Sequence, residues 1–292
     1  MSLTDASTVI DADFTNVTSV ETIKQTTAAH NMTLTLGALS SAAGIATVTG
    51  GTGTNSVTVG AGHTGALTVA LVAGTDTVAA TNYTGALTVT AADDSITSGD
   101  TITGGTGTSD NLAITGGGTA LAAGDLANVT GFETITATTN AAFGITLNDA
   151  NVAASKSLTI DGSALTTAVL TVVASNEADG TVTVTAGGTG AHQITLGNNN
   201  DTYTSTSTGI DNVIGTAGNN TITTGAGADT ILLGTGNDTV TAGAGDDVIS
   251  VATANLDSSD TIAGGADTDT LSLTNASTVI DTDFTNVTGV ET

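Results

Sequence analysis

The sequence predicts an all-β fold, a right-handed parallel β-solenoid or β-roll, for this chain of 292 residues. Residues 187–250 consist of seven nine-residue units with one extra residue, Ser205, and such a short period is typical of stacked coils. Runs in which threonine alternates with valine, leucine or isoleucine recur outside that block. Aromatic residues make up 2 % of the chain, although 39 % of it is hydrophobic, so a thin core is favoured over a thick one.

Each nine-residue unit predicts one turn and one strand. Glycine stands at the fourth position of almost every unit and permits a tight turn. The last three residues form a short strand whose middle side chain points inward. Two units then make a coil of about 18 residues, and coils stack about 4.8 Å apart. The inward side chains, at the eighth position, are Ile194, Tyr203, Val213, Ile222, Ile231, Val240 and Ile249.

The sixth position of the units predicts a metal site. It is occupied by His192, Asp201, Asp211, Asn220, Asp229, Asp238 and Asp247. Stacking places these residues in one column on each edge, where carboxylates would repel one another unless a cation lay between them. Carboxylates and turn carbonyls are hard oxygen ligands, which suit Ca²⁺. The alternative is a glycine- and aspartate-rich loop that holds no metal.

The units resemble the GGxGxDxUx nonapeptides of the RTX (repeats-in-toxin) family, in which a parallel β-roll is loaded with calcium. The resemblance implies several Ca²⁺ ions between successive turns of one edge, held by aspartate side chains and glycine carbonyls. One edge would hold Asp211, Asp229 and Asp247, and the other Asp201, Asn220 and Asp238. The glycines of the best-kept units are Gly225, Gly227, Gly234, Gly236, Gly243 and Gly245.

Two positions depart from this pattern, and two further turns extend it. His192 is a poor calcium ligand and Asn220 offers only a neutral carbonyl, so we expect weak binding or none at that end. The segment 100–110 resembles 260–269, and both are rich in glycine and aspartate. Their candidate ligands are Asp100, Asp110, Asp260, Asp267 and Asp269.

Near-identical segments mark the organisation of the chain. Residues 273–292 repeat residues 3–22 at a spacing of 270, which predicts a piece of a tandem array; the alternative is one domain with a duplicated edge element. A diverged third copy occupies 125–135, and each copy predicts a strand over its NVTxΦET segment. The predicted divisions are two related half-repeats at 1–98 and 99–186, the β-roll at 187–272, and the start of the next repeat at 273–292.

The remaining strands follow from strict alternation, the period-two signature of a half-buried strand. They are expected at 33–37, 56–60, 66–70, 86–90, 157–161 and 181–185. TGALTV recurs after 20 residues, at 64 and 84, which is consistent with one coil. Short helical turns are expected within 37–46 and 148–155.

Charge and composition exclude several functions. The chain has 28 acidic residues against Lys24 and Lys156, a net charge of −26, so it is not expected to bind nucleic acid or an anionic membrane. It has no cysteine, hence neither disulfides nor thiol chemistry. No apolar stretch is long enough to cross a bilayer.

Catalysis is not expected either, and we interpret the chain as a non-enzyme. His30, His63 and His192 fit no zinc or triad pattern, and we expect them on the surface or in turns. Paired carboxylates such as Asp93–Asp94 are interpreted as calcium ligands or solvated charge, and no lysine follows the glycine runs as phosphate binding would require. The repeated glutamates Glu21, Glu133 and Glu291 fit a structural role, at a turn or facing solvent, better than a metal site.

The wider pattern resembles bacterial S-layer proteins and giant surface adhesins, through segments 99–110, 131–135 and 158–172. The resemblance implies an extracellular, self-assembling structural repeat that folds on Ca²⁺. The repeated end segment 273–292 and the unpaired edges of a solenoid predict head-to-tail association with other copies, and a cell-surface polysaccharide is a further expected partner. The alternatives are a passive extender or an ice-binding module of a giant RTX adhesin. The Gly-Thr-Gly-Asn-Asp rank of such modules occurs here once, at 234–238.

Overall fold

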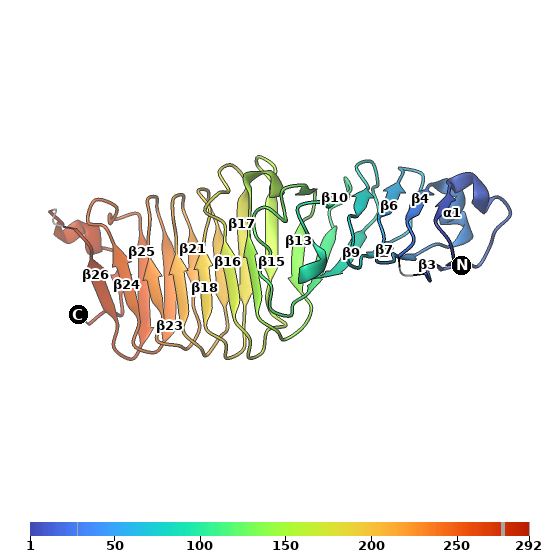
Figure 1. Cartoon of the computed structure of the whole chain (residues 1–292). Helices are drawn as coiled ribbons and strands as arrows, with labels where there is room; N and C mark the ends of the chain where they lie inside the picture. Colours follow the sequence, from blue (N-terminus) through green and yellow to red (C-terminus); the bar gives the residue numbers. More distant parts are fainter. Residues whose placement is uncertain (28, 276–277, 292) are drawn as a thin grey trace. The chain divides into compact units, whose positions relative to one another are not determined.

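The computed structural model describes residues 1–27, 29–275 and 278–291 (Figure 1). They divide into two compact units, Met1–Thr138 and Thr139–Thr292. Each unit stacks short parallel strands into two sheets, and the chain crosses from one sheet to the other through turns at both edges. The predicted all-β parallel solenoid is confirmed. The predicted divisions at 98, 186 and 272 follow sequence copies and stay predictions.

Strands of Met1–Thr138 alternate between its two sheets in chain order. The first sheet holds β1 (Ser2–Leu3), β3 (Thr22–Gln25), β5 (Thr47–Thr49), β7 (Leu67–Ala70), β9 (Leu87–Ala92), β11 (Asn111–Thr115) and β13 (Thr134–Ala137). The second holds β2 (Ser7–Val9), β4 (Met32–Leu36), β6 (Asn55–Val59), β8 (Thr77–Ala79), β10 (Thr101–Thr103) and β12 (Val129–Thr130). Thr68 pairs with Thr88, so the predicted 20-residue coil is confirmed.

Thr139–Thr292 has the same alternation. One sheet holds β15 (Ser157–Asp161), β17 (Thr181–Ala186), β19 (Thr202–Ser205), β21 (Thr221–Thr223), β23 (Thr239–Ala244), β25 (Thr261–Ala266) and β27 (Val287–Thr288). The other holds β14 (Phe143–Thr146), β16 (Leu170–Val173), β18 (His192–Thr195), β20 (Asp211–Ile214), β22 (Thr230–Leu232), β24 (Val248–Val251) and β26 (Thr270–Leu273). Thr221 pairs with Thr239, which confirms the 18-residue coil of the nonapeptide block.

The core between the two sheets of this unit is a narrow file of aliphatic side chains. All seven eighth-position residues are at most 1 % exposed, as the nine-residue period predicts. Because each short strand turns only one to three side chains inward, the core is thin, and the turns at the edges must supply the rest of the stability.

Helical segments are short and lie in turns. The two predicted ones are confirmed as α1 (Ala38–Ala43) and the 3₁₀ turn η3 (Asp149–Asn151). Three more 3₁₀ turns were not predicted: η1 (Asp11–Phe14), η2 (Asp93–Ser95) and η4 (Asp281–Phe284). In η1 the carboxylate of Asp13 accepts a hydrogen bond from the N–H of Ile10 at 2.9 Å, which stabilises the start of the turn.

The predicted NVTxΦET strand is wrong in the first copy. Asn16 and Ser19 have φ angles of 62° and 60°, so the chain turns there and β3 begins only at Thr22. In the other two copies the valine and threonine of this segment do form strands, β12 and β27. Asparagine and serine in turns adopt conformations that a strand pattern alone does not reveal.

Candidate metal centres

The turns of Thr139–Thr292 form two columns. We call the turns after the even-numbered strands the first edge and those after the odd-numbered strands the second edge. The first-edge turns are 147–156, 174–180, 196–201, 215–220, 233–238 and 252–260. The second-edge turns are 162–169, 187–191, 206–210, 224–229, 245–247 and 267–269.

Aspartates of the second edge connect successive coils. The backbone N–H of Asp211 donates to Oδ1 of Asp229 at 2.7 Å, and that of Asp229 donates to Oδ1 of Asp247, also at 2.7 Å. The N–H of Asp247 donates to Oδ1 of Asp269 at 2.9 Å, and the N–H of Asp269 donates to Oε2 of Glu291 at 2.8 Å. The sequence-predicted column therefore lies in register, and Glu291 extends it as a structural carboxylate.

The other oxygens of this column are buried without compensation. Within residues 1–27, 29–275 and 278–291, no hydrogen-bond partner reaches Oδ2 of Asp229, Asp247 or Asp269. Neither oxygen of Asp211 has a partner in hydrogen-bonding geometry, although the hydroxyls of Ser205 and Tyr203 lie close enough to stabilise its charged form. The four aspartate side chains are at most 1 % exposed. A buried carboxylate without a partner is costly, so such atoms fit a cation-binding site. The donor set, all oxygen and formally anionic, fits Ca²⁺.

Burial also changes the protonation of the second edge. It raises the pKa of Asp211 and of Asp229, and it raises the pKa of Asp247 to about 6. The nearby charges of Asp229 and Asp269 push the pKa of Asp247 in the same direction. A divalent cation would reverse these effects, because it favours the charged form of every carboxylate that it binds.

The aspartates of the first edge already have hydrogen-bond partners within the protein. Both oxygens of Asp201 accept backbone hydrogen bonds, from Val182 and Gly197, each at 2.7 Å. Both oxygens of Asp260 do so as well, from Asp238 at 2.8 Å and Asp257 at 2.9 Å. These aspartates can serve a metal only by sharing or releasing an N–H partner, so the two edges are not equivalent.

Between them, Asn220 and Asp238 complete the first-edge column. Oδ1 of Asn220 accepts the N–H of Asp201 at 3.0 Å, and Oδ1 of Asp238 accepts the N–H of Asn220 at 2.9 Å. The amide of Asn220 thus preserves the hydrogen-bond pattern of the column but brings no charge to it.

The candidate ligands in Met1–Thr138 likewise accept backbone hydrogen bonds at both carboxylate oxygens. Oδ1 of Asp110 accepts the N–H of Leu87 at 2.8 Å, and its Oδ2 accepts that of Gly105 at 2.7 Å. Oδ1 of Asp100 accepts the N–H of Asp76 at 2.6 Å, and its Oδ2 that of Thr97, also at 2.6 Å. The N–H of Asp110 in turn donates to Oε2 of Glu133 at 2.8 Å.

Sequence reasoning missed Asp76. This residue is fully buried, and among the described residues its Oδ2 has no hydrogen-bond partner. Burial raises its pKa. The signal available in the sequence was its place directly before a strand that begins with threonine, the position that Asp100 also holds. By contrast, Asp267 is exposed, has a φ of 80°, and accepts the N–H of Gly245 at 3.2 Å, so it shapes a turn.

The predicted glycines lie where turns of neighbouring coils touch. A Cβ atom on Gly243 would collide with the carbonyl oxygen of Gly225, and one on Gly245 with that of Gly227. On the first edge a Cβ on Gly236 would meet the carbonyl of Gly218, and one on Gly234 that of Thr216. Turn carbonyls are therefore directed along the stack, which is where a cation between coils would find them.

The expectation that the histidines lie on the surface or in turns is wrong for His192, which is fully buried in β18 and stands opposite Asp211 in the strand register. His63 does lie in a turn, between β6 and β7, although it is buried. Nδ1 of His192 accepts the N–H of Leu170 at 3.1 Å, so Nε2 carries the proton and donates to the carbonyl of Gly187 at 3.1 Å. Neither nitrogen retains a lone pair for a metal. A neutral imidazole here replaces the carboxylate of the column.

The nonapeptide turns match a known family of repeats. A family model described as the RTX calcium-binding nonapeptide repeat, in four copies, matches residues 205–240, 233–252 and 256–274. The chain carries RTX calcium-binding nonapeptide repeats within residues 205–274. RTX nonapeptide repeats bind calcium, which confirms the predicted Ca²⁺. No curated protein and no solved structure matches the chain. In the part of the RTX chain that the structure describes, no helix is long and apolar enough to cross a membrane.

The extent of the match agrees with the geometry. It begins at residue 205, after the units that carry His192 and Asp201, and it runs to 274, past Asp269. The orphaned carboxylates of Asp211, Asp229, Asp247 and Asp269 all lie within the matched RTX repeats. The second edge is thus our candidate for the main calcium column.

Substitutions in that column are expected to remove calcium. Asp229→Ala or Asp247→Ala takes away a ligand with a free oxygen and should lower the number of bound ions by at least one. Asp260→Ala, whose oxygens are already occupied, should cost less calcium. Isothermal titration calorimetry with Ca²⁺ measures both.

His192→Ala is the matched control for the register. It should leave the calcium count unchanged while lowering the free energy of unfolding by about 1–3 kcal/mol, because buried hydrogen-bonding groups lose their partner. If His192→Ala removed more calcium than Asp229→Ala, the assignment of ligands to the second edge would be wrong.

Proposed function

We propose that this RTX repeat chain is a structural unit of a secreted bacterial surface protein, of the S-layer or filament type, which folds and assembles on extracellular Ca²⁺. The observation that carries the proposal is the buried second-edge column, in which each of four carboxylates keeps at least one oxygen without a hydrogen-bond partner. RTX repeats are typical of secreted proteins. Calcium is scarce inside cells and abundant outside, so the same column would keep the chain loose before export and lock it afterwards.

A structural role also accounts for the paired carboxylates of Asp93 and Asp94. Oδ2 of Asp93 accepts backbone hydrogen bonds from Gly117 at 2.9 Å, and from Gly118 and Thr119 at 3.2 Å each. Three N–H donors hold this side chain in place and fix the loop around it. Asp93 therefore supports a turn, and we propose no reaction for the chain.

Assembly is supported by the two copies of the repeated segment. In the first copy Phe14 is 3 % exposed, and its 3₁₀ turn η1 contacts α1 of the following coil. In the second copy Phe284 is 37 % exposed and lines a pocket with Leu271, Leu273 and Val290. The same segment is thus covered in one place and open in the other. The occupant that fits the open copy is the coil that covers the first one, residues 23–45, supplied by a second chain.

This proposal has a structural condition. Residues 23–45 of the second chain are already covered by that chain's own residues 3–22. Association would therefore exchange one copy of the segment for another, and the contact is heterologous, so it propagates instead of closing.

We expect calcium-dependent end-to-end oligomers whose axial repeat is one 270-residue period. Deleting 273–292 should weaken them, and Phe284→Asp should do the same because it places a charge in the apolar contact. Ile214→Asp is the matched control: Ile214 is similarly exposed, at 41 %, but lies on the side of the stack. Analytical ultracentrifugation and electron microscopy provide the readout. A strict monomer at high concentration in millimolar Ca²⁺ would contradict assembly and favour the passive extender.

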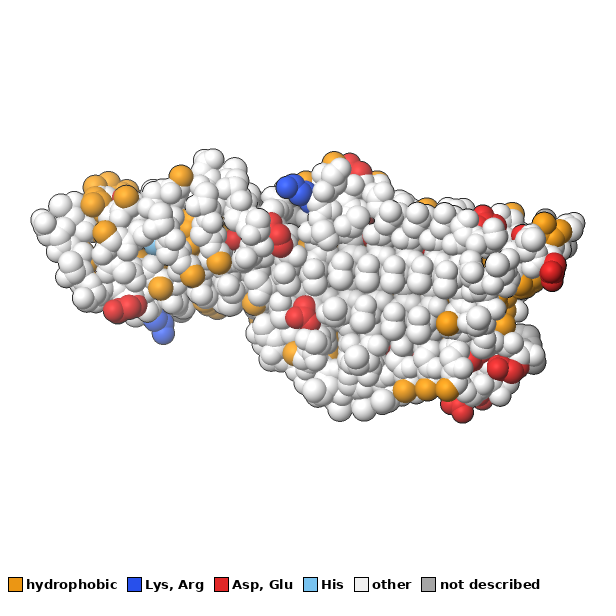
Figure 2. Space-filling model, turned by 180° about the vertical axis from the view of Figure 1, so that it is seen from behind, with side chains coloured by type: hydrophobic (Ala, Val, Ile, Leu, Met, Phe, Trp, Pro, Cys, Tyr) orange, Lys and Arg blue, Asp and Glu red, His pale blue; other side chains and the backbone are white. Residues whose placement is uncertain are grey.

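Ice binding remains a second candidate because of one specific observation. Four successive strands, β17, β19, β21 and β23, carry two threonines each in register, in the files Thr183–Thr202–Thr221–Thr239 and Thr185–Thr204–Thr223–Thr241. All are half-buried or exposed. Figure 2 shows a face of the molecule with few charged or hydrophobic side chains. Thermal hysteresis that is lost in Thr223→Lys would favour this candidate, and its absence from the unaltered chain would reject it.

A further inference from the structure

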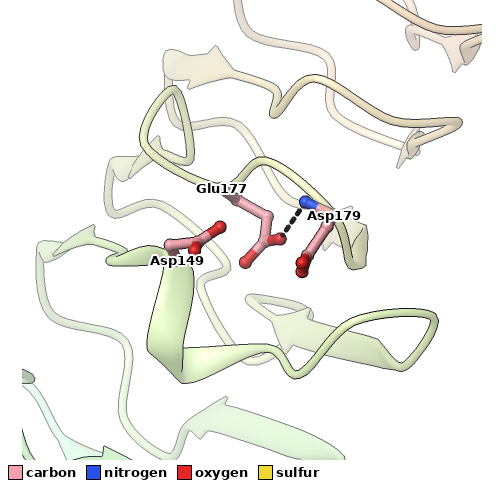
Figure 3. Close-up of side chains that lie close together, drawn as sticks. All are labelled: Asp149, Glu177 and Asp179. Atoms are coloured by element: carbon pink, nitrogen blue, oxygen red, sulfur yellow. Dashed lines mark hydrogen bonds between the residues drawn. The ribbon is translucent and has the colours of Figure 1, made fainter.

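Three carboxylates outside the matched repeats gather in one place. Asp149, Glu177 and Asp179 each direct a carboxylate oxygen into a common space, and these oxygens lie within 4.8 Å of one another (Figure 3). In the ranges that the structure describes, this is the single group of three or more such ligand residues. The sequence did not predict it, because none of the three occupies the sixth position of a nonapeptide.

Two neighbouring turns of the first edge build the cluster. Asp149 opens η3 in the turn 147–156, whereas Glu177 and Asp179 belong to the turn 174–180 of the next coil. Oδ1 of Asp149 accepts the N–H of Ala178 at 3.0 Å, and the side-chain amide of Asn176 donates to the carbonyl of Leu147 at 3.2 Å. These bonds tie the turns together, so the carboxylates are brought near one another by the fold itself.

Glu177 is the residue that distinguishes this cluster from ordinary surface charge. Its side chain is fully buried. Oε1 accepts two backbone hydrogen bonds, from Asp179 at 3.0 Å and from Gly180 at 2.6 Å. Oε2 is buried and, among the described residues, has no hydrogen-bond partner. That oxygen is directed toward the space shared with Asp149 and Asp179, as Figure 3 shows.

This arrangement is unfavourable without a counter-charge. An ionised carboxylate loses its hydration when it is buried, and two further carboxylates of the same sign stand beside it. Backbone N–H groups satisfy one oxygen of Glu177 and leave the other facing the two aspartates. A cation in the shared space would satisfy that oxygen and remove the repulsion.

We propose that Asp149, Glu177 and Asp179 bind a calcium ion at a site separate from the nonapeptide columns. Three carboxylates provide hard oxygen ligands, and Ca²⁺ accepts six to eight of them in flexible geometry, with water completing the shell. Zinc and copper sites rely on histidine or cysteine, which this cluster lacks. Two of the carboxylates are exposed, so an ion can enter from solvent.

The site would fix the coil on which the nonapeptide block stacks. The turn 174–180 directly precedes that of Asp201: the N–H of Asn198 donates to the carbonyl of Glu177 at 3.1 Å, and the side-chain amide of Asn199 donates to that of Ala178 at 3.1 Å. The family match starts only at residue 205. A metal at Glu177 would extend calcium-dependent order upstream of the matched repeats, to the coil that carries Asp149.

Calcium titration of the full chain tests the proposal. Glu177→Gln keeps the shape of the side chain and an acceptor for the N–H of Gly180, but it removes the charge. We expect it to bind one ion fewer per chain by isothermal titration calorimetry. Hydrogen exchange should also show that calcium no longer protects the amides of 174–180, while 224–247 keeps its protection. Asp94→Asn, the same type of change at an exposed carboxylate, should bind as many ions as the unaltered chain.

Other variants keep the result interpretable. If Glu177→Gln fails to fold, Asp149→Asn and Asp179→Asn decide, because both residues are exposed. Unchanged ion counts in those two variants, or in a folded Glu177→Gln chain, would overturn this site. The outcome is separable from that of the nonapeptide column. Loss of ions in Asp229→Ala alone would leave the column in place and reject the cluster, and loss in Glu177→Gln alone would do the reverse.

Discussion

Removal of calcium is expected to unfold the nonapeptide block. In EDTA, circular dichroism should show residues 187–272 largely disordered, and added Ca²⁺ should restore the β signal. The physical reason is the second edge: the buried carboxylates of Asp211, Asp229, Asp247 and Asp269 repel one another, and each keeps at least one oxygen without a hydrogen-bond partner when no cation is present. Binding energy is then folding energy, as in other small metal-dependent folds.

Two controls sharpen this result. Magnesium should substitute poorly, because it demands near-ideal octahedral geometry and gives up its water reluctantly. Hydrogen exchange should show that residues 87–110 retain protection better than 211–269, since both oxygens of Asp100 and Asp110 are already hydrogen-bonded. A spectrum that does not change on chelation would contradict calcium-dependent folding.

Mild acid is expected to stabilise the metal-free fold, as calcium does, but to a smaller extent. Burial raises the pKa of Asp201 and of Asp247 to about 6, from 3.8, and it raises that of Asp211, Asp229 and Asp238. At pH values between the ordinary pKa of 3.8 and the raised pKa of about 6, the folded metal-free chain holds protons that the unfolded chain releases. The stability of the metal-free chain therefore falls as pH rises through this range. Lowering the pH should therefore increase the β structure of the metal-free chain, opposite to ordinary acid unfolding.

The measurement is a titration of metal-free protein by circular dichroism from about pH 7.5 to about pH 4.5, with melting temperatures at each step. In the same range calcium affinity should decrease, because protons compete for the same oxygens. Asp247→Asn should weaken the pH dependence, since an amide does not titrate. A metal-free chain that loses β structure steadily on acidification would show that the buried aspartates do not govern its stability.

Periodicity was sufficient to predict the stack. The nine-residue period fixed the inward position of Ile222 and Val240 and the register of the aspartate columns, because each coil repeats the geometry of the one before it. Turn chemistry was less predictable. Asn16 adopts a positive φ where the strand pattern continues, and His192 takes the place of an aspartate by accepting a backbone N–H.

The metal ligands show where sequence reasoning stops. Asp260 and Asp247 look alike in the sequence, yet Asp260 has both oxygens occupied and Asp247 has one left over. That difference depends on which backbone N–H groups lie nearby in the folded chain. Asp149 and Glu177 are 28 positions apart and share no motif, so only the stacking of two turns of unequal length reveals that they meet.

The hydrogen bonds of the columns give the solenoid a direction. In every step from Asp211 to Glu291 the backbone N–H of one coil is bonded by the carboxylate of the coil that follows it. A stack cut between any two of these coils would thus present amide donors on one new face and carboxylate acceptors on the other. Such faces are complementary head to tail and mismatched head to head. Polarity along the axis, independent of any apolar patch, would favour one order of addition when a coil is exchanged between chains.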